Sequence, residues 1–349
     1  MHMQALAARQ RKTAGKDGRE VVAVTGASAG VGRAVAHAFA RKGARLGLIA
    51  RDERGLEAAR LECLRLGGEA IVLPADVACP DAVEQAAARL EETFGPLDVW
   101  VNDAMATVFA EFLDTDPAEF RRATEVTYLG CVHGTLSALR RMVPRDHGTV
   151  VQVGSALSYR AIPLQAAYCG SKFAIRGFTD SVRTELMHHQ SQVWLTMVQL
   201  PAVNTPQFNW CRTHLPNHPQ PVPPIYQPEV AAQAVYGAAH RRRREIWCGG
   251  SAVKAILGNT VAPWYADRVL ARSGYEAQQL ASVPVGPDRR DNLEHPVPEG
   301  AATHGMFGDI ARRRSLQLTL TLNRSAAALA AGAATVLGGT AVAALLRRR

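Results

Sequence analysis

Short apolar runs alternate with longer stretches of helical periodicity between Val21 and Cys248. The runs are rich in β-branched residues and almost continuously apolar, which is typical of parallel strands buried on both faces. They are Val21–Thr25, Arg45–Ala50, Ala70–Leu73, Leu97–Val101, Thr149–Gly154, Val193–Leu200 and Glu245–Cys248. Strands that alternate with helices predict an α/β fold built on a doubly wound parallel sheet of about seven strands.

The helical stretches between these runs are Val31–Lys42, Glu53–Leu66, Asp81–Phe94, Pro117–Val143, Gln165–His189 and Pro228–Arg243. We therefore expect one main domain over residues 21–250. Residues 1–20 are polar and basic, without the apolar segment of a secretory signal, and predict a disordered arm. Residues 251–323 predict a helical extension over Ser251–Leu280 that is followed by a linker rich in Pro, Asp and Arg over Pro284–Glu299.

The segment from Pro201 to Pro228 holds eight of the 19 prolines. It is too long and too rich in proline for an ordinary connection, so we interpret it as a functional loop over a site. Its aromatic residues Phe208, Trp210 and Tyr226 are candidate substrate contacts. Ordinary packing within the loop is the alternative for each of them.

The last part of the chain, residues 324–349, contains an apolar segment. Ala326–Leu346 carries no charge and is followed by three arginines. As a helix it is about 32 Å long, enough for the hydrocarbon core of a bilayer. We expect a candidate membrane helix at residues 326–346. A helix packed on the enzyme, on a partner or at a membrane interface remains the alternative.

Composition narrows the function classes. Hydrophobic residues are 47% and charged residues 20% of the chain, which excludes wholesale disorder and a polytopic membrane protein. The formal net charge of +9 comes largely from short arginine runs, without a basic stripe interleaved with aromatics, so no nucleic-acid partner is expected. None of the six cysteines lies at zinc-ligand spacing from another cysteine or a histidine. We expect neutral thiols and no metal site.

A glycine-rich turn joins the first strand to the first helix. Its glycines allow a tight turn and a close approach of the backbone to a pyrophosphate, and the helix N-terminus adds free N–H groups and a positive dipole. In this strand–turn–helix context the pattern predicts a dinucleotide site. The candidate cofactor-binding residues here are Thr25, Gly26, Ser28, Ala29, Gly30, Val31 and Gly32.

The spacing T-G-x-x-x-G-x-G over Thr25–Gly32 resembles the fingerprint of the short-chain dehydrogenase/reductase family. The resemblance covers about residues 20–250, because further family motifs follow at matching places. It implies a Rossmann fold, a nicotinamide dinucleotide as cofactor and a small-molecule substrate. It also implies a homo-oligomer formed through the two long helices.

The end of the second strand bears on which cofactor binds. An NAD-preferring site usually carries an acidic residue there, whereas this chain has Ala50 followed by Arg51. A guanidinium can pair with a 2′-phosphate, so NADP(H) is expected in preference to NAD(H). The resemblance further implies that Asp76 and Val77 hold the adenine and that Asn102 belongs to the cofactor site.

Tyr168 and Lys172 form a Y-x-x-x-K motif, which places both side chains on one face of a helix. A nearby ammonium favours the phenolate and lowers the pKa of a tyrosine towards working pH, as a general acid/base requires. Ser155 ends the preceding strand thirteen residues earlier, the spacing of the family. The resemblance implies that Ser155 polarises the substrate carbonyl, that Tyr168 transfers the proton and that Lys172 also contacts the nicotinamide ribose.

Other segments of the chain match the family's motifs only in part. Pro201, Val203 and Thr205 match a segment that contacts the carboxamide and pyrophosphate. Thr127 stands where the family has an asparagine in a water-mediated proton relay, so we expect a weaker or rearranged relay. Asp103 and Met105 depart from the family's N-N-A-G sequence.

The sequence thus predicts an NADP(H)-dependent oxidoreductase that transfers hydride between the nicotinamide and a carbonyl or secondary alcohol. A lipophilic substrate is expected from the proline-rich loop and the apolar tail. The catalytic domain is expected in the cytoplasm, where NADPH is found, with the tail as an anchor on a membrane. The alternative is a membrane-tethered NADP-binding regulatory or scaffold protein with little turnover.

Overall fold

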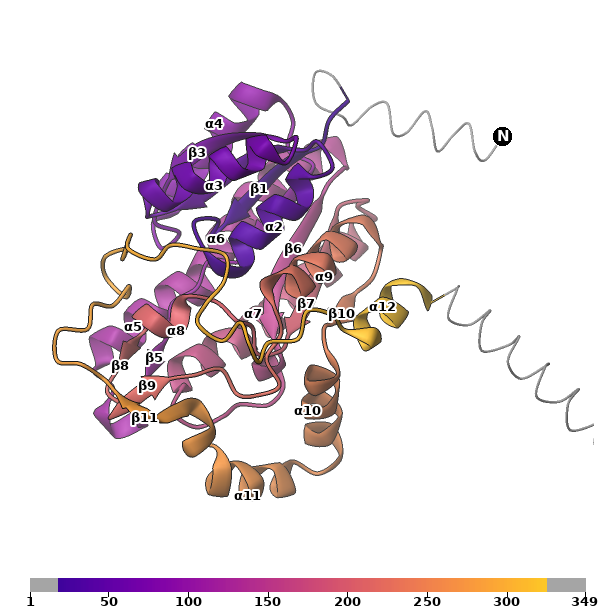
Figure 1. The fold of residues 1–349 in the computed structure, drawn as a ribbon. Coiled ribbons are helices and arrows are strands. Elements are labelled where there is room, and N and C mark those ends of the chain that lie inside the picture. Colours follow the sequence, from indigo (N-terminus) through magenta and orange to yellow (C-terminus); the bar gives the residue numbers. More distant parts are fainter. Residues whose placement is uncertain (1–17, 325–349) are drawn as a thin grey trace, which may run out of the picture.

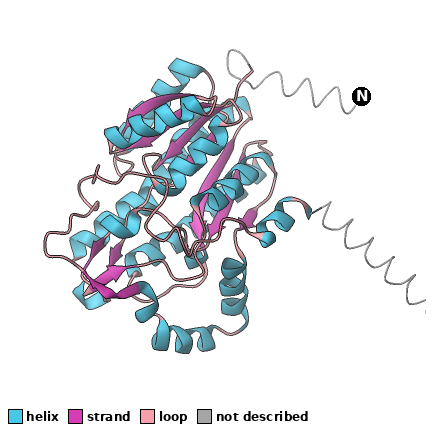
Figure 2. Cartoon of the chain, viewed as in Figure 1, coloured by secondary structure: helices cyan, strands magenta, loops and turns pink. Residues whose placement is uncertain are grey.

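The computed structural model describes residues 18–324. Its main feature is a seven-stranded sheet in the order β10-β7-β6-β4-β1-β2-β3, in which every neighbouring pair is parallel (Figures 1 and 2). The strands are β1 (Val21–Thr25), β2 (Arg45–Ala50), β3 (Glu69–Pro74), β4 (Val99–Asn102), β6 (Thr149–Ser155), β7 (Trp194–Leu200) and β10 (Glu245–Trp247). The predicted doubly wound sheet is confirmed. The strand order reverses between β1 and β4, where such sheets bind ligands.

Helices cover both faces of this sheet (Figure 2). Proline occupies the first turn of α4, α5 and α9, where its missing N–H costs nothing. Asp116 caps α5 by accepting a hydrogen bond from the backbone N–H of Ala118 at 2.7 Å. The helices of the main domain are α2 (Gly30–Ala40), α3 (Glu53–Arg65), α4 (Pro80–Phe94), α5 (Pro117–Thr124), α6 (Gly130–Met142), α7 (Ala166–His188) and α9 (Pro228–His240).

The core consists of two main apolar clusters, one on each side of the sheet. Helices α2, α3 and α9 contribute Phe39, Leu56 and Val235 to the first cluster. Leu90 from α4 and Met142 from α6 pack in the second. Each of these side chains is fully buried, which contributes about 1.5–3 kcal/mol apiece to folding. The carboxyl ends of the strands are thereby held as a rigid edge on which a site can be built.

The long helix expected over Pro117–Val143 is interrupted. Between α5 and α6 the residues Glu125–Leu129 form a π-helical turn. Thr127 lies in this turn, where its hydroxyl donates to the carbonyl of Ala106 at 2.8 Å and accepts from the N–H of Ala106 at 2.9 Å. These bonds tie the turn to the segment after β4, and they explain why a pattern with continuous helical periodicity is not one regular helix.

The proline-rich loop contains the short elements α8 (Gln207–Trp210), β8 (Arg212–Thr213) and β9 (Asn217–Pro219). β8 pairs with β5 (Val108–Phe109). β9 pairs with β11 (Gln279–Pro284), so the prediction of helix up to Leu280 is wrong at its end. Gln279 and Leu280 belong instead to strand β11, which pairs antiparallel with β9.

After β10 the chain forms α10 (Gly250–Val261) and α11 (Pro263–Ser273), a 3₁₀ turn at Glu276–Gln278, and β11. Residues 286–311, which we call the strap, then cross the sheet edge beside α5 and α2 and lead to α12 (Leu316–Leu322) (Figure 1). Leu318 and Leu322 of α12 are buried in the core cluster beside α9. The extension is therefore fastened to the domain at its far end.

Between residues 18 and 324, none of the helices combines the length and apolar character that crossing a membrane needs. The predicted membrane segment, residues 326–346, lies outside the described residues, as does most of the predicted N-terminal arm.

Candidate active site

A cavity of about 540 Å³ opens at the carboxyl edge of the sheet. Its walls come from the segments that follow β1, β2, β3, β4, β6 and β7, and from the extension. Most residues predicted for the site line this cavity: Gly26, Ser28, Ala29, Gly30, Val31, Arg51, Asp76, Val77, Ser155, Tyr168, Lys172, Pro201, Val203, Thr205, Phe208 and Trp210. Residues from six separate segments of sequence thus meet at one place.

The glycine-rich turn fits a phosphate group. Gly26 and Gly30 have positive φ values of 72° and 55°, which L side chains rarely adopt. A Cβ on Gly32 would lie 2.3 Å from the carbonyl oxygen of Gly26, so only glycine allows this close turn. Ala29 precedes α2 without a side-chain cap, and the first turn of α2 contains no acidic residue. The helix N-terminus is therefore suited to an anion.

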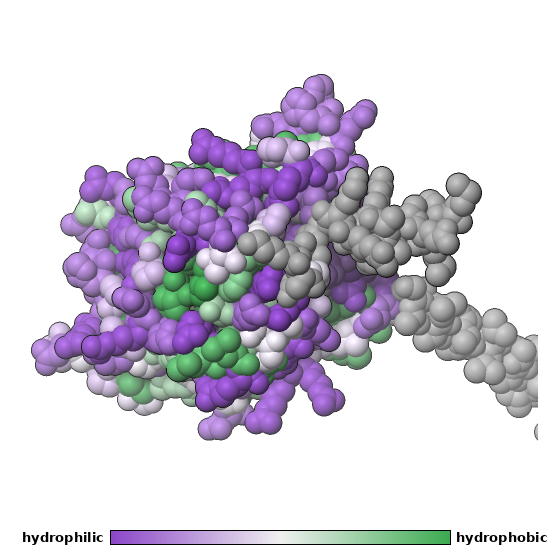
Figure 3. All heavy atoms as spheres, turned by 90° about the horizontal axis from the view of Figure 1, so that it is seen from above, coloured by the Kyte–Doolittle hydropathy of each residue, from purple (hydrophilic) through white to green (hydrophobic). Residues whose placement is uncertain are grey.

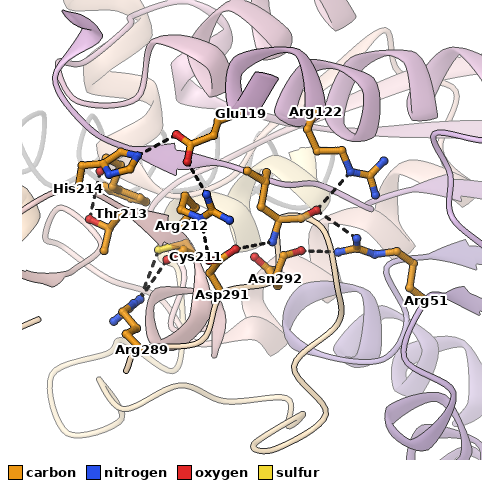
Figure 4. Close-up of polar contacts among 12 residues, drawn as sticks. Arg51, Glu119, Arg122, Cys211, Arg212, Thr213, His214, Arg289, Asp291 and Asn292 are labelled. Atoms are coloured by element: carbon orange, nitrogen blue, oxygen red, sulfur yellow. Dashed lines mark hydrogen bonds and ion pairs between the residues drawn. The ribbon is translucent and has the colours of Figure 1, made fainter. Parts of the chain in front are cut away.

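At one end of the cavity, which we call the Arg51 end, charged side chains meet the strap. Asp76 accepts a hydrogen bond from Ala78 N–H at 2.9 Å and forms an ion pair with Arg122 of α5. Arg122 and the other hydrogen bonds lower the pKa of this carboxyl, although burial opposes them. Arg51 and Arg122 both point at the strap, as Figure 4 shows. The sequence analysis did not identify Arg122.

The guanidinium of Arg51 donates to three consecutive carbonyl oxygens of the strap. The acceptors are Asn292, Leu293 at 3.1 Å and Glu294 at 2.7 Å. Arg122 also donates to the Leu293 carbonyl, at 3.3 Å. A guanidinium has five N–H donors, so the strap bonds described here engage three of those on Arg51 and leave two for a phosphate.

Further contacts hold the strap in place. Arg212 of β8 pairs with Asp291, and it also pairs with Glu119 of α5 (Figure 4). The Gly30 N–H donates to the Ala302 carbonyl at 2.9 Å, so the strap touches the glycine-rich turn itself. Beyond that point, the side chain of Asn204 accepts from the Phe307 N–H at 3.0 Å. The strap is thus bonded to the main domain on both sides of the cavity.

At the other end of the cavity, which we call the Tyr168 end, three predicted catalytic residues come together. Ser155 lies at the end of β6, and Tyr168 and Lys172 lie one turn apart on α7. The Lys172 ammonium donates to the Val153 carbonyl at 2.7 Å and lies 5.4 Å from the centre of the Tyr168 ring. Lys172 is buried, with 3% of its surface exposed.

The electrostatics differ from the simple expectation that Lys172 lowers the pKa of Tyr168. Burial raises the pKa of Tyr168, and the hydrogen bond with Ser155 opposes that rise only in part. Burial also lowers the pKa of Lys172, opposed by the charge of Asp103. The phenol is therefore neutral near pH 7 in this cavity.

Asp103 was noted in the sequence only as a departure from the family. It lies in the cavity wall against the glycine-rich turn, where a Cβ on Gly32 would be 2.9 Å from its Oδ2. Desolvation raises the pKa of Asp103 to about 7, while Lys172 and the Gly32 N–H act in the opposite direction. The charges of Asp103 and Lys172 thus influence each other: each moves the pKa of the other against the effect of burial.

Four residues predicted to bind the cofactor or take part in catalysis do not line the cavity but lie behind its wall. Thr25 accepts hydrogen bonds from the N–H groups of Asp103 and Ala104 at 3.0 and 3.1 Å. Asn102 accepts from Trp100 and donates to Gln152, inside the sheet. Asn102 was predicted to bind the cofactor. In the structure, its side-chain oxygen and nitrogen both form hydrogen bonds within this buried network. Gly32 provides space, and Thr127 is bonded to Ala106.

The outer wall beyond Tyr168 is mainly apolar. Its residues are Met105, Leu157, Ile162, Phe208, Trp210, Pro221, Val222 and Leu270. One polar pair crosses it, since Gln165 donates to Gln278 of the extension at 2.7 Å. The predicted loop contacts Phe208 and Trp210 lie here. Tyr226 does not, because it is buried in the core.

No sequence signal identified the strap or Arg122. The strap binds through backbone carbonyls, which every residue has, and Arg122 lies on a helix whose pattern is ordinary. Asp103 and Met105, where the sequence departs from the family, both line the cavity.

Comparisons with known proteins agree with this geometry. A family model described as short chain dehydrogenase matches residues 20–214. An uncharacterized oxidoreductase of Bacillus subtilis, YxnA, is 31% identical over 276 residues, which are 78% of this chain and 77% of that protein. Human dehydrogenase/reductase SDR family member 7 is 36% identical over 170 residues, 48% of this chain and half of the human protein.

Among solved structures, an alcohol dehydrogenase from the archaeon Thermococcus sibiricus, complexed with 5-hydroxy-NADP, matches with a TM-score of 0.57 and 28% identity. The match covers 66% of this chain and 95% of that one. The chain, with its parallel sheet and glycine-rich turn, belongs to the short-chain dehydrogenase family.

Proposed function

We propose that the protein is an NADP(H)-dependent oxidoreductase that interconverts a lipophilic carbonyl compound and its secondary alcohol. One observation carries the proposal. Ser155, Tyr168 and Lys172 face the same cavity as the glycine-rich turn. A proton donor and a hydride carrier are then within one enclosed space, which is what carbonyl reduction requires.

The chain's own residues act on the substrate oxygen. Bound nicotinamide supplies or accepts the hydride at the substrate carbon. The Ser155 hydroxyl donates a hydrogen bond to the carbonyl oxygen and so orients it. Because burial raises the pKa of Tyr168, its neutral phenol holds the proton that this oxygen needs on reduction. In the oxidative direction, the same side chain would have to accept the proton as a phenolate.

Lys172 supports this chemistry with a fixed charge. Its bond to the Val153 carbonyl holds the ammonium 5.4 Å from the centre of the Tyr168 ring, where a positive charge would favour the phenolate in the transition state. It would also reach the ribose of the nicotinamide. Pro201, Val203 and Thr205 would hold the carboxamide and pyrophosphate from the other side of the cavity.

The preference for NADP(H) rests on Arg51. Its two remaining donors are suited to a 2′-phosphate, and the strap bonds fix the guanidinium so that less side-chain entropy is lost on binding. Asp76 and Val77 would hold the adenine beside it. The bound 5-hydroxy-NADP of the Thermococcus enzyme supports the same choice.

A panel of carbonyl compounds of increasing apolar size tests the proposal, with NADPH consumption and alcohol product measured together. We expect turnover that increases with apolar size and is lost in Ser155→Ala and Tyr168→Phe. Cofactor binding without turnover on any member of the panel would instead favour the regulatory or scaffold alternative.

A further inference from the structure

Helix α11 differs from the other long helices of the described chain. It has eleven residues, Pro263–Ser273, and none of them is buried. A helix of this length is marginal in water on its own, and most helices gain their stability from packing one apolar face. In Figure 1 α11 lies at the bottom of the molecule, away from the sheet. Packing of α11 against a further surface would therefore stabilise it.

The side of α11 that faces the cavity has contacts within the protein. Asp267 pairs with Arg160 at 2.6 Å, and Leu270 and Ser273 belong to the wall of the cavity. Helix α10 contributes Ser251, Ala252 and Ala255 to the same wall. The two helices therefore form part of the cavity rim, and their other side faces outward.

The outward side of α11 is a stripe of aromatic, apolar and basic residues. Trp264, Arg268 and Arg272 are spaced four residues apart, and Tyr265 and Val269 lie beside them on the same face. Trp264 is 60% exposed and Tyr265 59% exposed, values that are high for such large rings. The Arg268 guanidinium lies 5.2 Å from the centre of the Trp264 ring.

Helix α10 continues this stripe with Lys254, Leu257 and Val261, of which Val261 is 83% exposed. We call these residues and the stripe on α11 the α10–α11 face. The face contains three cations, and the one carboxylate of α11, Asp267, is 67% exposed but is paired with Arg160 at 2.6 Å. It is complementary to a surface that is negatively charged outside and apolar just beneath.

Another exposed apolar pair among the described residues has acidic neighbours in the sequence instead of cations. The most exposed apolar pair, Phe112 and Leu113, is flanked by Glu111 and Asp114 and carries no cation. Seen from the opposite end of the molecule, the surface is mostly hydrophilic (Figure 3). Aromatic rings and cations on one helix face are the chemistry that binds to the interface of an anionic bilayer.

We propose that the α10–α11 face is a docking surface for an anionic lipid bilayer. The rings of Trp264 and Tyr265 enter the interface, and Lys254, Arg268 and Arg272 contact lipid phosphates. The cavity rim then lies against the membrane, so that an apolar substrate passes between lipid and active site. Docking itself does not depend on the reaction proposed above.

The test is vesicle flotation of the full-length protein. Vesicles of phosphatidylcholine are compared with vesicles of phosphatidylcholine and phosphatidylglycerol in equal parts. We expect binding to the anionic vesicles to fall roughly tenfold or more in Trp264→Ser/Tyr265→Ser and in Arg268→Gln/Arg272→Gln. The matched control, Phe112→Ser/Leu113→Ser, removes one ring and one aliphatic side chain that are even more exposed, and it should bind like the wild type.

Residues 326–346 are kept in every variant. Differences in vesicle binding among the variants therefore report on the α10–α11 face. Hydrogen exchange locates the contact directly, and we expect the amides of residues 254–272 to be protected when anionic vesicles are added. Unchanged flotation of both α11 variants, or no protection of these amides, would overturn the proposal. Protection that appears without lipid and grows with protein concentration would also overturn it, because a second copy would then cover the face.

Discussion

The two ends of the cavity are built in different ways. At the Tyr168 end, Ser155, Tyr168 and Lys172 come from β6 and α7, and their positions depend on the buried sheet. At the Arg51 end, the side chains of Arg51 and Arg122 are held by the backbone carbonyls of the strap, a segment without regular structure. The groups proposed to transfer protons thus lie on regular elements, whereas the end proposed to hold the adenosine is closed by a segment without regular structure.

The largest effect should come from the rigid end. Tyr168→Phe removes the proton donor but leaves the shape of the cavity almost unchanged. We expect turnover to fall by about 10³-fold, within the range that general acid catalysis contributes. Measured by NADPH oxidation with the best substrate of the panel, this loss should appear in kcat, while cofactor affinity stays as it is. A variant that keeps more than a tenth of wild-type turnover would mean that another group supplies the proton.

A change in the strap should act on the release of the cofactor. Phe307 is buried against Phe208 and Ile225, and Phe307→Ala removes packing of about 3–5 kcal/mol from the point where the strap is fastened. We expect roughly tenfold faster release of NADPH, measured by stopped-flow fluorescence, because loosened contacts mostly raise dissociation rates.

The matched control is Phe94→Ala. Phe94 is similarly buried, with 8% of its surface exposed, but it lies on α4 in the second core cluster. It should lower the free energy of unfolding and leave NADPH release unchanged. Equal release rates in Phe307→Ala and wild type would show that the strap does not enclose the cofactor.

A smaller effect concerns the pH dependence of stability. The pKa of Asp103 is raised to about 7 in the folded protein, against about 3.9 in the unfolded chain. Because the folded state holds this proton more tightly, the contribution of Asp103 to stability is most favourable below pH 4 and is lost between about pH 4 and 7. Asp103→Asn should therefore gain stability relative to wild type as the pH rises through this range. A stability difference independent of pH, measured by urea unfolding, would contradict the assignment.

The two ends also differ in how far the sequence predicts them. Strands β1 and β2 lie at the predicted residues, because continuous apolar runs leave little choice between buried strand and other structures. The motifs around Gly30 and Tyr168 were recognisable since they need particular side chains at fixed spacing. Thr127 was placed in a regular helix, and the π-helical turn there results from bonds to Ala106 that no periodicity encodes.

The Arg51 end could be predicted only in part. Arg51 was recognised by its position after β2, but its partners are carbonyl groups some 240 residues away in the sequence. Any residue can present a carbonyl, so composition contains no sign of them. The same reason hid the role of Asn204 in holding the strap through a backbone N–H.

A titration of the full-length protein with NADPH and with NADH, followed by intrinsic fluorescence, tests the central claim most directly. Wild type is compared with Arg51→Ala and with Arg60→Ala, a partly exposed arginine on α3 paired with Glu57. We predict tighter binding of NADPH than of NADH, a loss of about 1–3 kcal/mol for NADPH alone in Arg51→Ala, and no change in Arg60→Ala. Equal affinity for both cofactors in wild type would contradict the NADP(H) assignment, and no binding of either would contradict the proposed function as a whole.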